Sequence, residues 1–333
     1  MTEVLAVDIG FGWSKALTLH GQALIPSLVG PAETIRYESD VIPANGHGIA
    51  VEVDGRLYFV GEQAELQSAS RSQTLDGSRT GSAEHKALFY ALASELLPTT
   101  VDKVAVVSGL PVADYDERGK AALRDMLKGA HVVKRQGKRE RRFEVTGVHT
   151  MPQAMGSLFA LVLDRRGQLA DGDLAGARVG IVDVGTLTTN YILVDRLRYV
   201  EVDSDSITTG MAELLQKVAK DLKREYGFDW TLQLGKVDQA VRTRTVEPYG
   251  DPVNISHLVE PHLESLADTI ISHARTLWGT GVELKALVLA GGGSVALAPA
   301  MRKAYPHTRT VGGDPQFANV TGYLRAGLRK FGG

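Results

Sequence analysis

Cysteine is absent from the 333 residues of this chain. Its absence excludes a thiol nucleophile, a CxxC redox pair and a zinc site built on thiolates, and a reducing cytoplasm is the expected setting. The nine histidines include no HExxH pair, so we expect no transition-metal site. No serine lies in a G-x-S-x-G turn, which argues against a serine hydrolase.

Long apolar runs and a strong net charge are also absent. No stretch approaches about 18 consecutive apolar residues, and the first residues lack the pattern of a signal peptide, so we expect no membrane contact. A formal net charge of −2 gives no field for general nucleic-acid binding. The chain is therefore expected to be an ordinary globular protein of about two domains.

One short segment, residues 134–142, is strongly basic and has six Lys and Arg residues. Apolar residues flank it, and this pattern predicts a β-hairpin with a solvated, charged tip. A contact with a partner, or with the next subunit of an assembly, is the alternative interpretation. Direct DNA binding is not expected, because a single basic run without interleaved aromatic residues offers no stacking surface.

Strand and helix patterns alternate along the chain, which is typical of an α/β fold. A polar loop is expected at 68–82, and a Gly- and Asp-rich connector at 165–176. Strands are predicted at 4–9, 15–19, 57–60, 104–107, 143–149, 179–183, 191–194 and 286–289. Helices are predicted at 84–97, 114–127, 152–163, 210–226, 235–242, 256–277, 296–304 and 316–330.

Two segments about half a chain apart share one pattern: an apolar strand, Asp-x-Gly, a small polar turn and a second strand. In each, glycine lets the backbone approach a phosphate closely, with N–H groups forming an anion cradle. The aspartate can hold the water shell of Mg²⁺, and Asp183 could also orient an attacking water. The candidate phosphate-binding residues are Asp8, Gly10, Phe11, Gly12, Trp13, Ser14 and Lys15 in the first segment, and Gly185, Thr186, Leu187 and Thr188 in the second. An ordinary glycine-containing hairpin is the alternative for each.

A third signal is a buried strand that runs into Gly291, Gly292, Gly293 and Ser294 at the start of a helix. Backbone access at a helix N-terminus suits the adenosine or α-phosphate of a nucleotide. The order of the three signals resembles the actin, Hsp70 and sugar-kinase superfamily over nearly the whole chain. No GxxxxGK[ST] P-loop is present.

The resemblance implies duplicated ribonuclease-H-like domains of the actin/Hsp70 type, with a nucleotide cleft between them. Domain I is expected at 1–170 with the closing helix 316–333, and domain II at 176–315. Four motifs are similar to the ParM/StbA plasmid-segregation branch and its archaeal actin-like relatives, in the same order: FVGEQA at 59–64, VSGLP at 107–111, MPQAMGSL at 151–158 and DPQFANVTG at 314–322, which Tyr323 extends.

In that branch, the residue corresponding to Gln153 orients the water that attacks the γ-phosphate, which suits a glutamine chemically. A role in capping the following helix is the alternative. The resemblance brings Gly210 near the nucleotide, and Lys236 and Gln239 toward the adenosine. Asn190 stands where many relatives have aspartate, so a metal role at that position is doubtful.

The resemblance thus implies an ATPase that binds ATP or ADP with Mg²⁺, the metal being reached by Asp8 and Asp183 through water. It implies filaments of this chain with itself and, for plasmid segregation, a DNA-bound adaptor protein. A small-molecule kinase and a chaperone-like or division-type ATPase on the same fold are the alternatives.

Overall fold

The computed structural model describes residues 2–33, 48–68, 80–231 and 233–332. They form two compact units, Met1–Gly172 with Phe317–Gly333, and Asp173–Gln316. We call these the first and second unit. Most of the predicted loop at 68–82 lies outside the described residues.

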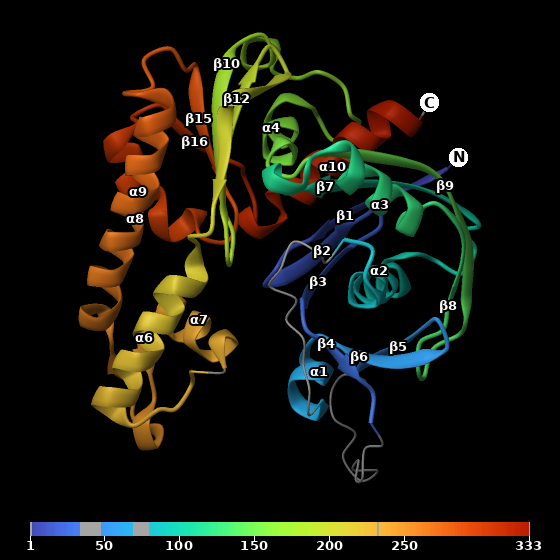
Figure 1. The fold of residues 1–333 in the computed structure, drawn as a ribbon, viewed down its shortest axis with the longest axis horizontal. Helices are drawn as coiled ribbons and strands as arrows, with labels where there is room; N and C mark the ends of the chain where they lie inside the picture. Colours follow the sequence, from blue (N-terminus) through green and yellow to red (C-terminus); the bar gives the residue numbers. More distant parts are fainter. Residues whose placement is uncertain (1, 34–47, 69–79, 232, 333) are drawn as a thin grey trace. The chain divides into compact units, whose positions relative to one another are not determined.

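The first unit is built on a six-stranded sheet in the order β3-β2-β1-β7-β9-β8 (Figure 1). Strands β1, β7 and β9 run parallel, while β2, β3 and β8 are antiparallel to their neighbours. The strands are β1 (Glu3–Ile9), β2 (Trp13–Leu17), β3 (Gln22–Pro26), β7 (Lys103–Leu110), β8 (Gly129–Val133) and β9 (Arg141–Pro152). A smaller sheet contains β4 (Val29–Pro31), β6 (Arg56–Val60) and β5 (Ile49–Val53).

Helices cover the sheet of the first unit. Helix α2 (Ala83–Leu96) is apolar around most of its circumference, and it is buried in a core with β1, β7 and α3 (Glu117–Leu127). Helix α10 (Ala318–Phe331) packs on β1, β7 and α4 (Met155–Val162). Side chains cap α2 and α3, because Ser82 and Asp116 accept from backbone N–H groups of their first turns. The short helix α1 (Glu62–Gln67) packs against β6.

The second unit has a five-stranded sheet in the order β12-β11-β10-β15-β16. The strands are β10 (Arg178–Val184), β11 (Thr189–Asp195), β12 (Arg198–Ile207), β15 (Ala286–Ala290) and β16 (Thr308–Thr310). The helices are α5 (Gly172–Ala175), α6 (Met211–Tyr226), α7 (Leu234–Thr243), α8 (Ser256–Trp278) and α9 (Ser294–Ala304). Two short strands, β13 (Thr245–Val246) and β14 (Val253–Asn254), pair with each other, and 3-10 turns lie at Val112–Asp114, Pro248–Gly250 and Pro315–Phe317.

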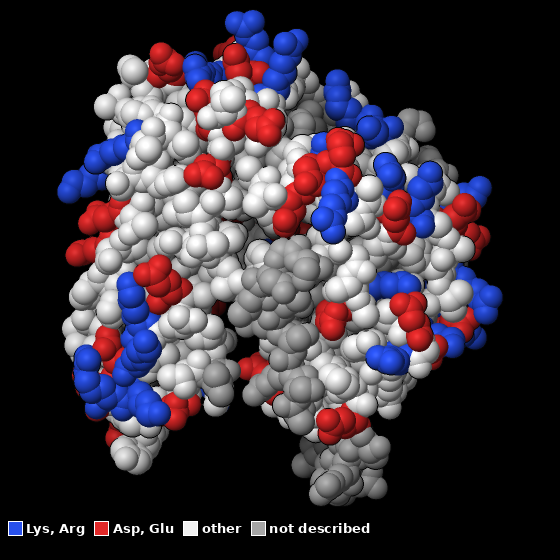
Figure 2. All heavy atoms as spheres, in the orientation of Figure 1, with Lys and Arg blue, Asp and Glu red and all other residues white. Residues whose placement is uncertain are grey.

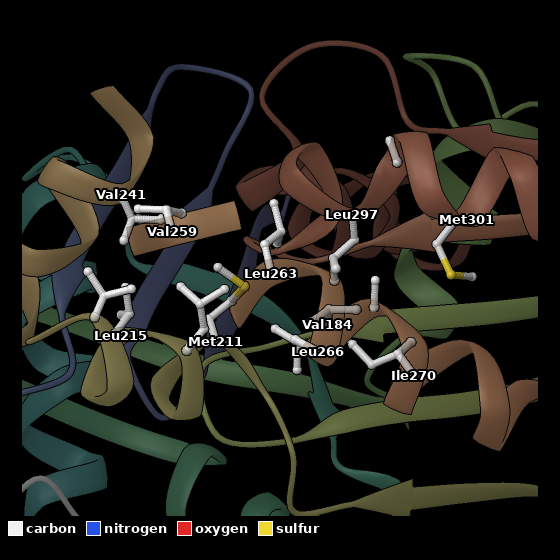
Figure 3. Close-up of a cluster of buried hydrophobic side chains, with 14 of the residues drawn as sticks. Val184, Met211, Leu215, Val241, Val259, Leu263, Leu266, Ile270, Leu297 and Met301 are labelled. Atoms are coloured by element: carbon white, nitrogen blue, oxygen red, sulfur yellow. The ribbon is translucent and has the colours of Figure 1, made fainter. Parts of the chain in front are cut away.

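The core of the second unit lies between one face of its sheet and helices α6, α8 and α9. Figure 3 shows Val184 at the end of β10 among side chains of these helices, including Leu215, Leu266 and Leu297. Helix α6 has an amphipathic pattern and ends at Gly227, which adopts the left-handed conformation (φ 77°) that terminates many helices. Its apolar face is buried in this core, and its first residue, Met211, follows shortly after the end of β12 at Ile207.

Every predicted strand and helix is present, with shifted ends. The shifted end that matters most for the candidate site is that of β9. This strand pairs with β7 as far as Pro152, so the next helix begins at Met155 rather than at residue 152. The residue at the N-cap is Ala154, so the alternative role of Gln153 as a helix cap is wrong. No helix among the described residues is long and apolar enough to cross a bilayer.

The basic segment 134–142 does link two strands, β8 and β9, as predicted. Its tip, residues 136–140, is exposed as predicted. Arg135, nearer β8, is buried, donates to Ser94 and forms an ion pair with Glu95 of α2. Lys134 pairs with Glu52 at 2.9 Å, and Arg141 donates to the backbone oxygen of Leu97. These contacts tie the hairpin to its own unit. On the face shown in Figure 2, basic and acidic side chains are interspersed.

Candidate functional site

The hairpin β1–β2 brings an acid and a base together in the first unit. Asp8 and Lys15 lie opposite each other in the strand register, and their side chains form an ion pair at 3.4 Å. Asp8 is only 2% exposed. The backbone N–H of Gly10 donates to Trp13 O at 3.2 Å, and a methyl group on Gly10 would lie 2.9 Å from that oxygen. The turn therefore requires glycine at this position.

The hairpin β10–β11 of the second unit repeats this construction. Asp183 lies opposite Asn190 in the same register in which Asp8 lies opposite Lys15. The N–H of Gly185 donates to Thr188 O at 2.9 Å, as Gly10 does in the first hairpin. The internal sequence repeat is thus also a structural repeat. The two hairpins differ in charge, because Asn190 replaces the cation.

Ser27, in the loop after β3, braces the first hairpin. Its hydroxyl donates to Gly10 O at 2.6 Å and bonds the Ser14 hydroxyl at 2.7 Å, and its N–H donates to Gly12 O at 2.9 Å. Both serines are buried. These bonds fix two carbonyls of the turn, and therefore the direction of its peptide groups. Sequence reasoning missed Ser27, because no local motif marks a serine that acts on a turn of another strand pair.

Gln153 and Asp8 meet at the ends of β9 and β1. The side-chain amide of Gln153 donates from Nε2 to Asp8 Oδ1 at 2.5 Å. Its backbone N–H donates to Leu110 O at 2.7 Å, and its carbonyl accepts from the Tyr323 hydroxyl at 2.6 Å. Asp8 therefore accepts from both Lys15 and Gln153, while no hydrogen bond to Oε1 of Gln153 is found among the described residues.

In the second unit, the glycine-rich loop after β15 packs against the second hairpin. Gly291 has φ 82°, and a methyl group there would lie 2.4 Å from Asp183 Oδ1. The N–H of Gly293 donates to Val184 O at 3.1 Å. Ser294 begins α9 and is fully buried. The second hairpin and the loop therefore form one cluster.

Gly210 belongs to the same cluster. A methyl group there would lie 2.7 Å from Thr186 O and 2.8 Å from Gly185 O. The first N–H groups of α6, at Met211 and Ala212, donate to the second hairpin as well. By contrast, Lys236 and Gln239 occupy exposed positions on α7, and no hydrogen bond among the described residues joins them to the cluster. Their adenosine role stays a prediction.

A divalent ion would have few direct protein ligands here. Among the described residues, no group of three or more His, Asp and Glu side chains is arranged to hold a metal. Asp8 and Asp183 are buried carboxylates, one on each hairpin. A single buried carboxylate of this kind suits Mg²⁺, which keeps several waters and binds mainly through phosphate oxygens. It does not fit a metal enclosed by protein side chains.

Comparisons with known proteins agree with this arrangement. Residues 6–156 match the family description "actin like proteins N terminal domain", and residues 181–303 match "archaeal actin homologue MreB-like, C-terminal". The chain belongs to the actin-like proteins. Each Asp-x-Gly hairpin of this actin-like protein starts close to the beginning of one matched region.

Solved structures show the same fold. Ta0583, an archaeal actin homologue, has a TM-score of 0.81 and 20% identity, covering 98% of this chain and all of that one. A structure of Ta0583 in complex with ADP has a TM-score of 0.79 and 21% identity over 98% and 100% of the two chains. A ParM from a 15-stranded filament of Clostridium botulinum has a TM-score of 0.80 and 22% identity, covering 99% of each chain. Curated protein sequences give no significant match.

Proposed function

We propose that this actin-like protein binds Mg-ATP through its two phosphate hairpins, hydrolyses it, and assembles with copies of itself into dynamic filaments. The observation that carries the proposal is the pair of matching hairpins together with Gln153 held on Asp8 at 2.5 Å. The Ta0583 complex with ADP supports nucleotide binding, and the ParM filament supports self-assembly.

Each group has a task in this proposal. The backbone N–H groups of the turns and the Lys15 ammonium bind phosphate oxygens. Gln153 donates to Asp8 and accepts from the attacking water, which it orients toward the γ-phosphate. Asp8 and Asp183 would hold a Mg²⁺ ion through its waters, and that ion would supply neutralisation of the phosphate charge.

The cellular role we propose is cytoplasmic, either segregation of plasmid or other DNA through a DNA-bound adaptor or a cytoskeletal task. ATP favours assembly, and hydrolysis loosens it. The basic hairpin 134–142 is not proposed as a DNA site, because three of its cations are bound to groups of the first unit.

The test compares Gln153→Ala with a matched control, Gln168→Ala, whose side chain is exposed on a turn. Phosphate release and ATP-dependent pelleting are followed together over time. We expect Gln153→Ala to lower turnover by about 10- to 1,000-fold, with filaments that form and persist longer. Gln168→Ala should behave as wild type. Wild-type phosphate release in Gln153→Ala would refute the catalytic role, and absence of ATP-dependent pelleting by the wild type would refute filament formation.

A further inference from the structure

Helix α10 carries a tyrosine whose hydroxyl reaches the turn that presents Gln153. Tyr323 is fully buried, and its hydroxyl donates to the Gln153 carbonyl at 2.6 Å. The same carbonyl accepts from the N–H of Gly156 at 3.3 Å. Since Gln153 precedes the helix and is not part of it, these bonds and the one to Leu110 O fix its backbone.

The hydroxyl of Tyr323 has room beside the Gln153 turn only because β7 has a glycine, Gly109, next to it. A methyl group on Gly109 would lie 1.9 Å from the Tyr323 hydroxyl oxygen and 2.8 Å from the Cα atom of Gln153. Neither distance is possible for real atoms, so any side chain at Gly109 must displace the tyrosine or the turn. The glycine of the VSGLP motif thus has a local physical reason.

Close helix packing holds the tyrosine in place. Gly322 of α10 faces Gly156 of α4, and a methyl group on Gly322 would lie 1.7 Å from Gly156 O. Arg325, one turn further along α10, donates to the carbonyls of Ala160 and Leu163 at the end of α4. Helices α4 and α10 are therefore closely packed and joined by hydrogen bonds, with the Tyr323 hydroxyl at the Gln153 turn that precedes α4.

We propose that Tyr323 is a positioning residue for ATP hydrolysis. Its hydroxyl fixes the Gln153 carbonyl, and this keeps the Gln153 side chain on Asp8 and in line for the attacking water. The inference rests on the proposed function and adds that the position of α10 sets the position of Gln153. The chain enters the first unit at Phe317, and α10 begins at the next residue. Displacement of α10 would therefore move the glutamine.

The conservative variant Tyr323→Phe removes only the hydroxyl. A catalytic group displaced by a fraction of an ångström loses transition-state stabilisation while ground-state binding is retained. We expect kcat for phosphate release to fall by about 5- to 50-fold, while KM for ATP and ADP affinity change by less than about twofold. Gly109→Ala perturbs the same contact from β7, and we expect a decrease in kcat of the same kind.

The matched control is Tyr305→Phe. Tyr305 is also buried and donates to a backbone carbonyl, that of Gly279, at 3.1 Å, but it belongs to the second unit. Its loss should lower the thermal midpoint without changing kcat. Tyr323→Phe is also combined with Gln153→Ala. If the tyrosine acts through the glutamine, it should have no further effect on kcat in that background.

The outcomes separate the two proposals. Wild-type kcat in a folded Tyr323→Phe protein, or an equal loss of kcat with and without Gln153, overturns the positioning role and leaves the proposed function intact. Parallel changes in kcat and KM that follow the loss of thermal stability also overturn it. Absence of ATP turnover in the wild type overturns the proposed function, and the inference with it.

Discussion

The brace formed by Ser27 should link nucleotide affinity to the stability of the first unit. Ser27→Ala removes the hydroxyl that donates to Gly10 O at 2.6 Å and bonds Ser14 at 2.7 Å. Both serines are buried, at 2% and 0% exposure, so water cannot replace the lost partner easily. The turn that we propose as the first anion cradle would then lose the side-chain support that Ser27 gives it.

The expected cost follows from the bonds lost. Two buried hydrogen bonds, with the Ser14 hydroxyl left without this partner, correspond to about 2–4 kcal/mol. For a unit of this size, this lowers the thermal midpoint by roughly 4–16 °C. Because the Ser27 hydroxyl fixes the carbonyl of Gly10, its loss would let the peptide groups of the proposed phosphate cradle reorient. We therefore also expect ATP affinity to fall about tenfold, or ~1.4 kcal/mol.

The assay is calorimetric ATP binding together with thermal unfolding, and Ser94→Ala is the control. Ser94 is likewise buried in the first unit and donates to Ala91 O at 2.7 Å. Its other partner is Arg135 of the basic hairpin, and no hydrogen bond among the described residues joins it to the β1–β2 hairpin. Ser94→Ala should lose stability and keep its ATP affinity. A double variant of Ser14 and Ser27 should cost less than the sum of the two single variants, because both single changes break one shared bond. If Ser27→Ala and Ser94→Ala bind ATP equally well, the brace does not support the cradle.

Three further predictions concern stability. Gly322→Ala should destabilise the protein by about 1–3 kcal/mol or more, because the added methyl group overpacks α10 against α4. Gly235→Ala, where a methyl group meets nothing within 4 Å, should instead stabilise it by about 0.4–1 kcal/mol. Urea titration measures both variants, and equal effects on stability would refute the close approach of α10 to α4. Burial lowers the pKa of the His131 imidazole in the folded protein. The neutral imidazole therefore contributes its full stabilisation at pH values above the pKa of histidine in the unfolded chain, about 6.5, and this stabilisation is lost as the pH falls below that pKa. His131→Phe should therefore flatten the decrease in urea midpoint between about pH 7.5 and 5.5, and an unchanged slope would contradict this. In the basic hairpin, Arg135→Ala should cost about 1.5–3 kcal/mol, the usual value for a charged hydrogen bond, while Arg139→Ser should leave stability and DNA binding unchanged in thermal unfolding and gel-shift assays.

Local pattern was sufficient to find most elements that have a buried face. Helix α8 and strands β1, β10 and β15 are apolar at the positions that their periodicity requires, so each was predicted to within two residues. Strand β12 was missed because its residues are mostly exposed or half-buried, and its sequence has few apolar positions. Its extended form comes from pairing with β11, which a local pattern does not record.

The sequence by itself determined the two Asp-x-Gly hairpins. Their turns and alternating strands are local features, and the repetition half a chain apart can be read directly from the sequence. Which groups support those hairpins was decided only by tertiary structure. Ser27 acts on a turn formed by an earlier strand pair, Gln153 reaches Asp8 through an extended β9, and Tyr323 holds Gln153 from the last helix. Each of these contacts joins residues far apart in the chain, and a hydrogen bond of that kind leaves no periodicity or spacing in the sequence.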